Sequence, residues 1–349
     1  MGVIGVTCPA KAKSAGRCPE LNGTPTLKQI ASLDALWQGY RDATKHKKNR
    51  RPILDYARNA GANIQRTHEL LMAGRYEPVP PRSFWITEPK PRRIDAPSIR
   101  DSVVQHSIYN AVYQLFDRGF IHDNYGCRIG KGTHRANDAV QRYMRQCGGD
   151  EYYLQLDIRN FYYSIDHAVL RERIERKIKD PGLVDLMMDF SGEPPTGLFI
   201  GNLMSQLYGL VYLDWLDQHV KRHLRVKRYV RYVDDFVLIG LTLDEAHDLK
   251  AHLERWLWEN LRLELSKWRI AKVRHGINFV GFRTWRKGRF VRKRSLHNFS
   301  KALKREKIES LQSILANAKR SGSHKHMVAR IRHEKPHLMK EIANDLLMH

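Results

Sequence analysis

The chain has 349 residues, and its 61 Lys and Arg against 37 Asp and Glu give a formal net charge of +24 and a pI of about 10.0. An apolar content of 42% with seven Trp and fifteen Tyr excludes a disordered chain, and no apolar run reaches the roughly 18 to 20 residues of a membrane span. Such a positive charge predicts a polyanionic partner, most often nucleic acid, with a merely soluble basic surface as the alternative.

The cysteines and the N-terminus indicate the cellular compartment. Cys8, Cys18, Cys127 and Cys147 are too few and too scattered for a disulfide scaffold, and none forms a CxxC pair, so neither disulfides nor a zinc site is expected. The first 19 residues lack the apolar core and cleavage site of a signal peptide. We therefore predict a cytoplasmic protein with free thiols and no contact with a membrane.

Four segments organise the N-terminal half. Residues 1–24, rich in Gly, Pro, Lys and Ser, predict a loose extension. Apolar residues at helical spacing predict a helix over 26–40. Prolines among basic residues at 83–101 predict extended segments and turns, and 102–119 reads as a helix with one apolar side.

The second half predicts strands alternating with helices. Residues 152–158 predict a buried strand that ends near Asp157, and 229–239 predict two short strands folded about an Asp-Asp turn. The other predictions are helices over 166–179, 203–222 and 249–257, a strand pair over 277–285, and basic helices from 286 onward.

Carboxylates carry the predicted chemistry. Asp234 and Asp235 are neighbours between apolar runs, and two such charges raise each other's pKa unless cations neutralise them. Oxygen-only ligands favour Mg²⁺. An ordinary hairpin turn is the alternative, but Asp157 ends an apolar strand, where an acid is costly unless it is paired or metal-bound. Three such carboxylates predict a two-metal site that activates a 3′-hydroxyl.

Several motifs then resemble reverse transcriptases over roughly residues 68–285. Tyr232-Val233-Asp234-Asp235 is similar to their YxDD box, and Asp157 followed by Tyr162 resembles their first palm motif. Other blocks in matching order are Lys90-Pro91-Arg92, Tyr125-Gly126-Cys127-Arg128 with residues 130–134, and the primer-grip-like residues 276–282. Ordered motifs together are a stronger signal than any one alone.

The resemblance implies an α+β right-hand polymerase with helical fingers, an antiparallel-sheet palm and a helical thumb. The expected boundaries are 1–24 for the extension, 25–150 for the fingers, 151–285 for the palm and 286–349 for a basic thumb that tracks a duplex. It implies an RNA-directed DNA polymerase that uses two Mg²⁺ ions, dNTP substrates, a structured template RNA and an RNA/cDNA duplex.

It also implies roles for single residues. The expected catalytic metal ligands are Asp157, Asp234 and Asp235 with the Ile158 carbonyl. Tyr162 would be the steric gate against ribonucleotides, with a core aromatic as its alternative. Lys267 competes with Arg269 for the position near the leaving phosphate. The remaining expected contacts are Lys90, Arg92, Ile200, Gly201, Gln206 and Arg269 for dNTP, and Arg128, Gly281 and Phe282 for template and primer.

One block departs from the common family pattern. Ile200 replaces a Gln and Gln206 replaces a Pro in the usual Gln-Gly-x-x-x-Ser-Pro sequence. This variant resembles diversity-generating retroelement reverse transcriptases, which copy a template repeat with errors opposite adenine. That subfamily implies a small basic helical partner, the accessory variability determinant, which forms a pentameric barrel.

Other functions remain open from the sequence. The nearest alternative is an antiphage-defence reverse transcriptase that uses a different noncoding RNA. A group II intron enzyme is less favoured because no maturase or endonuclease segment follows, and a retron enzyme because no Val-Thr-Gly follows the primer-grip block. A non-catalytic RNA-binding scaffold is the alternative from another class, against which the three intact aspartates argue.

Overall fold

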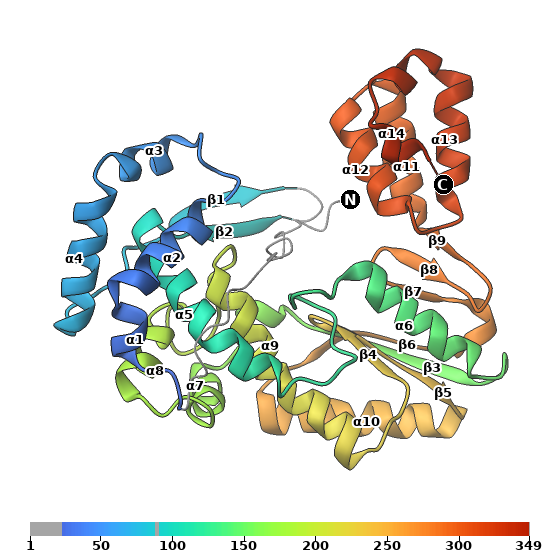
Figure 1. Ribbon diagram of the computed structural model, residues 1–349. Coiled ribbons are helices and arrows are strands. Elements are labelled where there is room, and N and C mark those ends of the chain that lie inside the picture. The colour runs from blue at the N-terminus through green and yellow to red at the C-terminus, as the bar shows by residue number, and fades with distance from the viewer. Residues whose placement is uncertain (1–22, 88–90, 349) are drawn as a thin grey trace.

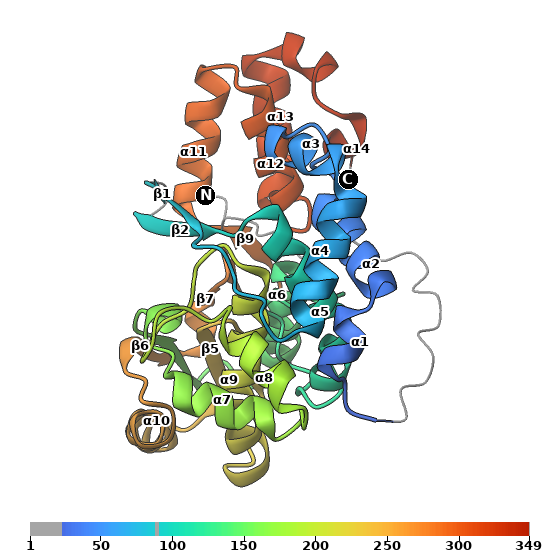
Figure 2. The same ribbon diagram turned by 90° about the vertical axis from the view of Figure 1, so that its left-hand side faces the viewer.

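The structure, a computed structural model, describes residues 23–87 and 91–348. A helical N-terminal region, a central antiparallel sheet and a C-terminal group of helices follow one another along the chain (Figures 1 and 2). This arrangement confirms the predicted α+β class. The extension predicted over 1–24 lies almost entirely outside the described residues. None of the described helices has the length and apolarity to cross a bilayer.

The N-terminal region consists of helices with one projecting hairpin. The helix predicted over 26–40 is two helices, because Ser32 has a ψ of 147° and its hydroxyl accepts from the Ala35 N–H, which ends one helix and caps the next. The hairpin pairs Arg82–Ile86 with Arg92–Ala96 (Figure 1). The elements are α1 (Leu27–Ala31), α2 (Leu33–Thr44), α3 (Arg51–Arg58), α4 (Ala60–Met72), β1 (Arg82–Ile86), β2 (Arg92–Ala96) and α5 (Ile99–Asp117).

A four-stranded antiparallel sheet with the order β4-β5-β3-β6 forms the centre. Side chains alternate between its faces, so Leu154 and Leu156 join the core beneath α9 and α10, whereas Tyr153 and Val237 pack with α6. Asp157, two residues beyond Gln155, belongs to the α6 face. The elements are α6 (Thr133–Arg145), β3 (Tyr152–Ile158), α7 (His167–Glu175), α8 (Pro181–Met188), α9 (Leu203–Gln218), β4 (Tyr229–Tyr232), β5 (Asp235–Leu241), α10 (Leu243–Leu261) and β6 (Leu265–Lys272).

A smaller sheet joins this centre to the C-terminal helices. Its order is β7-β8-β9, and β9 pairs with β8 from Phe282↔Val291 to Thr284↔Arg289. The expected boundary at 286 therefore falls inside a hairpin, and the first helix of the tail begins at Lys293 (Figure 1). The elements are β7 (Ile277–Phe279), β8 (Phe282–Thr284), β9 (Arg289–Val291), α11 (Lys293–Lys304), α12 (Ile308–Ala318), α13 (Ser323–Glu334) and α14 (Asn344–Leu347), with short helical turns at Phe161–Tyr163, His219–His223, Val273–His275 and Pro336–Lys340.

Candidate active site

The sheet brings the three predicted metal ligands to one end. Asp157 is the register partner of Asp235 across β3 and β5, so their side chains leave the same face. Asp234 lies in the two-residue loop between β4 and β5, and its carbonyl accepts from the Ile158 N–H at 3.3 Å. Residues far apart in the sequence thus place three carboxylates and the Ile158 backbone together.

These carboxylates repel one another. Burial, followed by the charge of Asp157, raises the pKa of Asp234 to about 6. Burial also raises the pKa of Asp235 to about 7, with Asp157 and Asp234 adding to the effect and a hydrogen bond from Gln155 opposing it. Ionising all three at neutral pH is therefore costly unless positive charge is nearby.

Two polar side chains hold the acids in place. Gln155 Nε2 donates to Asp235 Oδ1 and to the Asn278 carbonyl, both at 2.9 Å. Ser266 Oγ donates to Asp157 Oδ2 at 2.7 Å, from a position where the β3–β6 register shifts by one residue. The β-bulge turns Ser266 toward Asp157. Gln155 connects the Asp235 carboxylate to the backbone of β7 through its two hydrogen bonds.

The donor set suits a hard divalent cation. Carboxylate oxygens and one backbone carbonyl are the ligands that Mg²⁺ takes, usually with substrate phosphates completing the shell. Over residues 23–87 and 91–348, no three His, Cys, Asp or Glu side chains already converge on a metal position. The charge and chemistry of Asp157, Asp234 and Asp235 fit such an ion.

The loop that carries Asp234 has an unfavourable backbone. Val233 has a φ of 57°, which is rare for a β-branched residue, whereas the φ of Asp234 is negative. Positive φ at the first loop position alone is the pattern of a type II′ hairpin, where Gly is favoured. Such strain costs on the order of 1 to 3 kcal/mol and persists only where the surroundings enforce it.

The fingers-side loop presses directly on this strained residue. A Cβ on Gly126 would lie 2.5 Å from the Val233 nitrogen and 2.7 Å from its Cγ2, so only Gly fits there. Backbone bonds join the two segments, from Tyr125 N–H to Arg231 O at 2.9 Å and from Arg231 N–H to Asp123 O at 3.0 Å. The loop of Val233 and Asp234 is thereby packed against residues 123–126.

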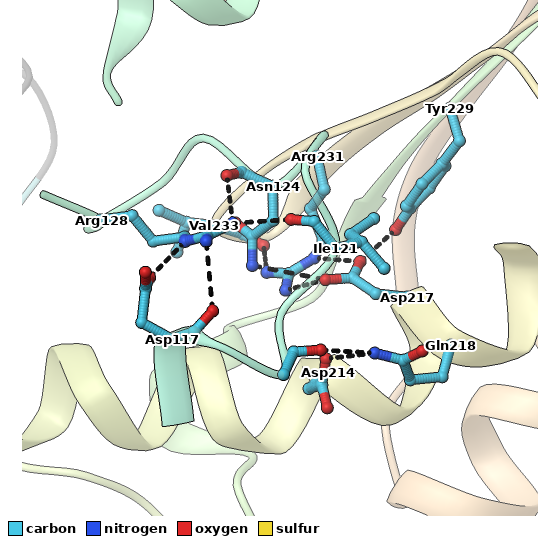
Figure 3. A network of polar contacts seen from close by, with 11 residues as sticks. Asp117, Ile121, Asn124, Arg128, Asp214, Asp217, Gln218, Tyr229, Arg231 and Val233 are labelled. Carbon is cyan, nitrogen blue, oxygen red and sulfur yellow. Dashed lines mark hydrogen bonds and ion pairs between the residues drawn. The ribbon is translucent and has the colours of Figure 1, made fainter. Parts of the chain in front are cut away.

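A buried ion pair holds the same loop from beneath (Figure 3). Arg231 and Asp217 are both 0% exposed, and the guanidinium binds the carboxylate through Nε at 2.7 Å and Nη2 at 2.6 Å. The third nitrogen, Nη1, donates to the Val233 carbonyl at 2.9 Å. The Tyr229 hydroxyl also donates to Asp217, at 2.8 Å. The planar fork of Arg231 thus connects α9 to the strained loop.

Arg128 does not face a template. It is 7% exposed, and its guanidinium binds Asp117 Oδ1 at 2.7 Å and the carbonyls of Ile121 at 2.6 Å and Asn124 at 3.2 Å (Figure 3). A buried guanidinium engaged in this way stabilises the 117–128 loop. The expected template contact is therefore not supported by its placement.

Tyr162 lies beside the carboxylates and is also packed. Its ring is half-buried, 5.2 Å from the Phe161 ring, and its Cε1 lies close to Gly209 on α9. Burial raises the pKa of its hydroxyl, with Cys127 and Asp234 adding to the effect. The ring therefore packs against Phe161 and α9, and its role as a steric gate stays a prediction.

The loop around Ile200 and Gly201, two of the expected nucleotide contacts, lies against β2. The Ile200 carbonyl accepts from the Asp95 N–H at 2.7 Å. Gly201 has a φ of 111°, and a Cβ there would lie 2.8 Å from Ile94 Cγ2, so β2 approaches closely. Arg92, also on β2, is exposed, and its charge opposes the raised pKa of Asp234. Lys90 lies outside the described residues.

β6 places Lys267 nearer to the acids than Arg269. Lys267 is the register partner of Asp157, whereas Arg269 pairs with Gln155, one side-chain repeat farther along the same face. Directly opposed Cβ atoms are about 4.5 to 5.5 Å apart. Both side chains are exposed. For the position near the leaving phosphate, Lys267 is therefore better placed than Arg269, the residue that we expected.

The primer-grip-like turn contains Gly281, which has open space beside it, and Phe282, which is buried. Gly281 has a φ of 88°, a Cβ there would meet nothing within 4 Å, and its carbonyl accepts from the Arg292 N–H at 3.2 Å. Phe282 is 0% exposed in the core of the C-terminal helices, so its ring does not face a primer. Gln206 is half-buried on α9, apart from the three acids in sequence and element.

Four supporting residues were not predicted. They are Gln155, Asp217, Arg231 and Ser266. The sequence could have indicated that Arg231 is paired, because a charged residue inside an apolar strand needs a buried partner. Nothing in the sequence pointed to Asp217 as that partner, or to the register shift that aims Ser266.

Comparisons with known proteins agree with this geometry. Residues 87–284 match the family described as reverse transcriptase (RNA-dependent DNA polymerase). The chain is 25% identical over 314 residues to Protein YkfC of Escherichia coli, covering 74% of this chain and 81% of that protein. It is 26% identical over 175 residues to the group II intron-encoded protein LtrA of Lactococcus lactis subsp. cremoris, covering 45% of this chain and 28% of that protein.

One solved structure supports the fold. Telomerase from Candida albicans, solved in complex with a TWJ fragment of telomeric RNA, superposes with a TM-score of 0.51 at 10% identity. The match covers 78% of this chain and 58% of the telomerase chain. At this identity the likeness concerns the right-hand architecture alone.

Proposed function

Because the chain belongs to the reverse transcriptase (RNA-dependent DNA polymerase) family, we propose that it extends a primer 3′-end with deoxynucleotides on an RNA template. The observation that carries the proposal is the meeting of Asp157, Asp234 and Asp235 at one end of the sheet. The test is extension of a DNA primer annealed to RNA by the purified protein with dNTPs, with a metal-free reaction as the blank.

The proposal gives the residues of the site distinct tasks. Divalent cations held by Asp157, Asp234, Asp235 and the Ile158 carbonyl, Mg²⁺ in our proposal, would activate the primer hydroxyl and offset charge at phosphorus. Gln155 and Ser266 keep two of the carboxylates oriented. Lys267 and Arg92 supply positive charge beside the acids for the triphosphate.

The first prediction separates the two cations of β6. Lys267→Ala is expected to slow single-nucleotide incorporation about ten-fold or more, because Lys267 is the register partner of Asp157 and charge-assisted contacts to phosphate are strong. Arg269→Ala is the matched control, because it removes the same charge two residues further along the same face of β6. It is expected to have a smaller effect. An equal or reversed order of the two rates would restore Arg269 as the phosphate contact.

The second prediction concerns Tyr162. Tyr162→Ala is expected to raise the ratio of ribonucleotide to deoxynucleotide incorporation, because a ring packed under C2′ of the sugar would exclude a 2′-hydroxyl. Contacts with Phe161 and α9 support the ring. Tyr162→Phe is the control, since it keeps the ring and loses only the hydroxyl. An active alanine variant with an unchanged ratio would show that the ring serves packing and that the gate lies elsewhere.

We further propose that the polymerase is error-prone at template adenine and serves diversification of a variable gene. The support is Ile200, which replaces the amide of the common pattern beside the β2 contact of Gly201. An Ile side chain cannot form hydrogen bonds and is stiff at its β-branch. A pocket that holds the nascent pair by shape alone would lose discrimination of roughly 1 to 3 kcal/mol.

The third prediction tests this mechanism. With Ile200→Gln, misincorporation opposite adenine is expected to fall while errors at other bases change little, as measured by sequencing cDNA copied from one defined RNA. Ile200→Leu is the control, because it changes shape without adding an amide. An identical adenine error rate in wild type and Ile200→Gln would favour the antiphage-defence alternative.

The proposed diversification role implies two partners. One is a structured RNA from the same locus, which the net charge of +24 suits. The other is the pentameric accessory variability determinant. Sequencing the RNA that copurifies with the protein tests the first, and a template and variable repeat pair beside the gene would support both.

A further inference from the structure

The turn between β8 and β9 gathers cations at one end of α6. Arg145 at the end of α6, with Arg286 and Lys287 of the turn, lines a hollow of about 540 Å³. In the part of the chain that the structure describes, none of the three forms an ion pair with a carboxylate, and the nearby Glu151 binds Arg228 and the Gly148 N–H instead. We name Arg145, Arg286 and Lys287 the distal basic turn.

The turn is built rather than loose. Gln141 and Arg145, one helical turn apart on α6, donate to consecutive carbonyls of the turn, those of Trp285 at 3.0 Å and Arg286 at 2.9 Å. The Trp285 N–H closes the turn on the Gly288 carbonyl at 2.7 Å. The side chains of Arg286 and Lys287 therefore project from a fixed backbone, which lowers the entropy lost on binding a ligand.

The aromatic side chains of this hairpin accompany a fourth cation, Arg283, rather than the three that line the hollow. The Trp285 ring packs over Gly276, where a Cβ would lie 2.7 Å from it, and the Arg283 guanidinium lies 4.9 Å from the ring centre. Phe290 meets Trp285 edge-on at 5.9 Å and is 47% exposed. A cluster of Arg and Lys side chains on one surface is typical of nucleic-acid binding.

The distal basic turn lies apart from the three acids. Gly281, whose carbonyl is bound by Arg292, marks the opposite end of β8 from residues 285–288. Along β3, Tyr152 at the far end is five positions before Asp157, about 17 Å at the rise of a strand. Figure 1 shows α6 and the β8–β9 hairpin on the side of the molecule away from α1–α5.

We propose that the distal basic turn binds the sugar-phosphate backbone of an RNA segment that lies outside the polymerase cleft. Arg and Lys side chains that are not neutralised by carboxylates bind phosphates through charge, independently of sequence and with strong salt dependence. A template longer than the duplex in the cleft would be anchored there. The proposal rests on the proposed function only in taking RNA as the molecule that the protein carries.

The test compares RNA binding with polymerisation in the full chain. With Arg286→Gln/Lys287→Gln, affinity for a long hairpin RNA is expected to fall about ten-fold at low salt, and the log–log slope of affinity against salt to fall by about two. Single-nucleotide extension on a short primer–template confined to the cleft is expected to stay at the wild-type rate.

The control variant is Arg171→Gln/Arg176→Gln, which removes the same charge from cations that already pair with carboxylates. It is expected to bind the hairpin RNA like wild type. Wild-type affinity and salt slope in Arg286→Gln/Lys287→Gln, or an equal loss in the control, would overturn the distal site. Failure of the wild-type protein to extend any primer would instead contradict the proposed function.

Discussion

Asp234→Asn is expected to abolish primer extension while RNA binding stays within a few-fold of wild type. The amide keeps the shape of the loop but loses the charge that a cation requires, and removing one metal ligand costs several kcal/mol of transition-state stabilisation. About 4 kcal/mol corresponds to roughly a thousand-fold loss of rate. Rates from single-turnover extension, with filter binding of the same RNA, measure both quantities.

Folding of this variant is not expected to suffer. Asp234 is crowded by Asp157 and Asp235, and its pKa is raised to about 6, so its negative charge is unfavourable in the folded chain at neutral pH. The thermal midpoint should therefore equal or exceed that of wild type. Asp244→Asn, at the exposed start of α10, is the matched control and should retain full activity. Near wild-type extension by Asp234→Asn would show that the acids assigned to the metals are wrong.

Arg231→Met is expected to be the most destabilising single change in the site. It leaves Asp217 charged at 0% exposure, with the Tyr229 hydroxyl and the Asn124 amide as its remaining partners. Breaking a buried ion pair from one side costs about 3 to 5 kcal/mol. Thermal or urea unfolding of the variant measures this loss.

The double variant Arg231→Met/Asp217→Leu separates stability from positioning. Replacing both charges with apolar side chains removes the uncompensated carboxylate, so most of the stability should return. The Val233 carbonyl still lacks its donor, and the loop at φ 57° can relax. We expect extension to remain about ten- to a hundred-fold below wild type, as small displacements of catalytic groups produce. Recovery of both stability and rate would reduce Arg231 to a structural role.

Much of the site was readable from residue order. The alternation of Tyr-Tyr-Leu-Gln-Leu-Asp-Ile predicted a strand ending at Asp157, and the apolar runs around Asp234 and Asp235 predicted the hairpin, because side-chain period and turn composition are local properties. The basic charge and the ordered motifs indicated a polymerase of RNA templates. The sequence did not reveal that Phe282 is buried or that Arg128 serves the 117–128 loop, because burial depends on which distant elements cover a residue.

Residue order therefore reveals the class of chemistry, which is three acids at strand ends in a basic α+β chain. How those acids are held depends on contacts between distant parts of the chain. The pairing of Arg231 with Asp217, the bulge that aims Ser266 at Asp157, and the register that sets Lys267 rather than Arg269 across from Asp157 all join residues distant in sequence. Their partners follow from strand order and helix packing, which depend on the whole core and not on local periodicity.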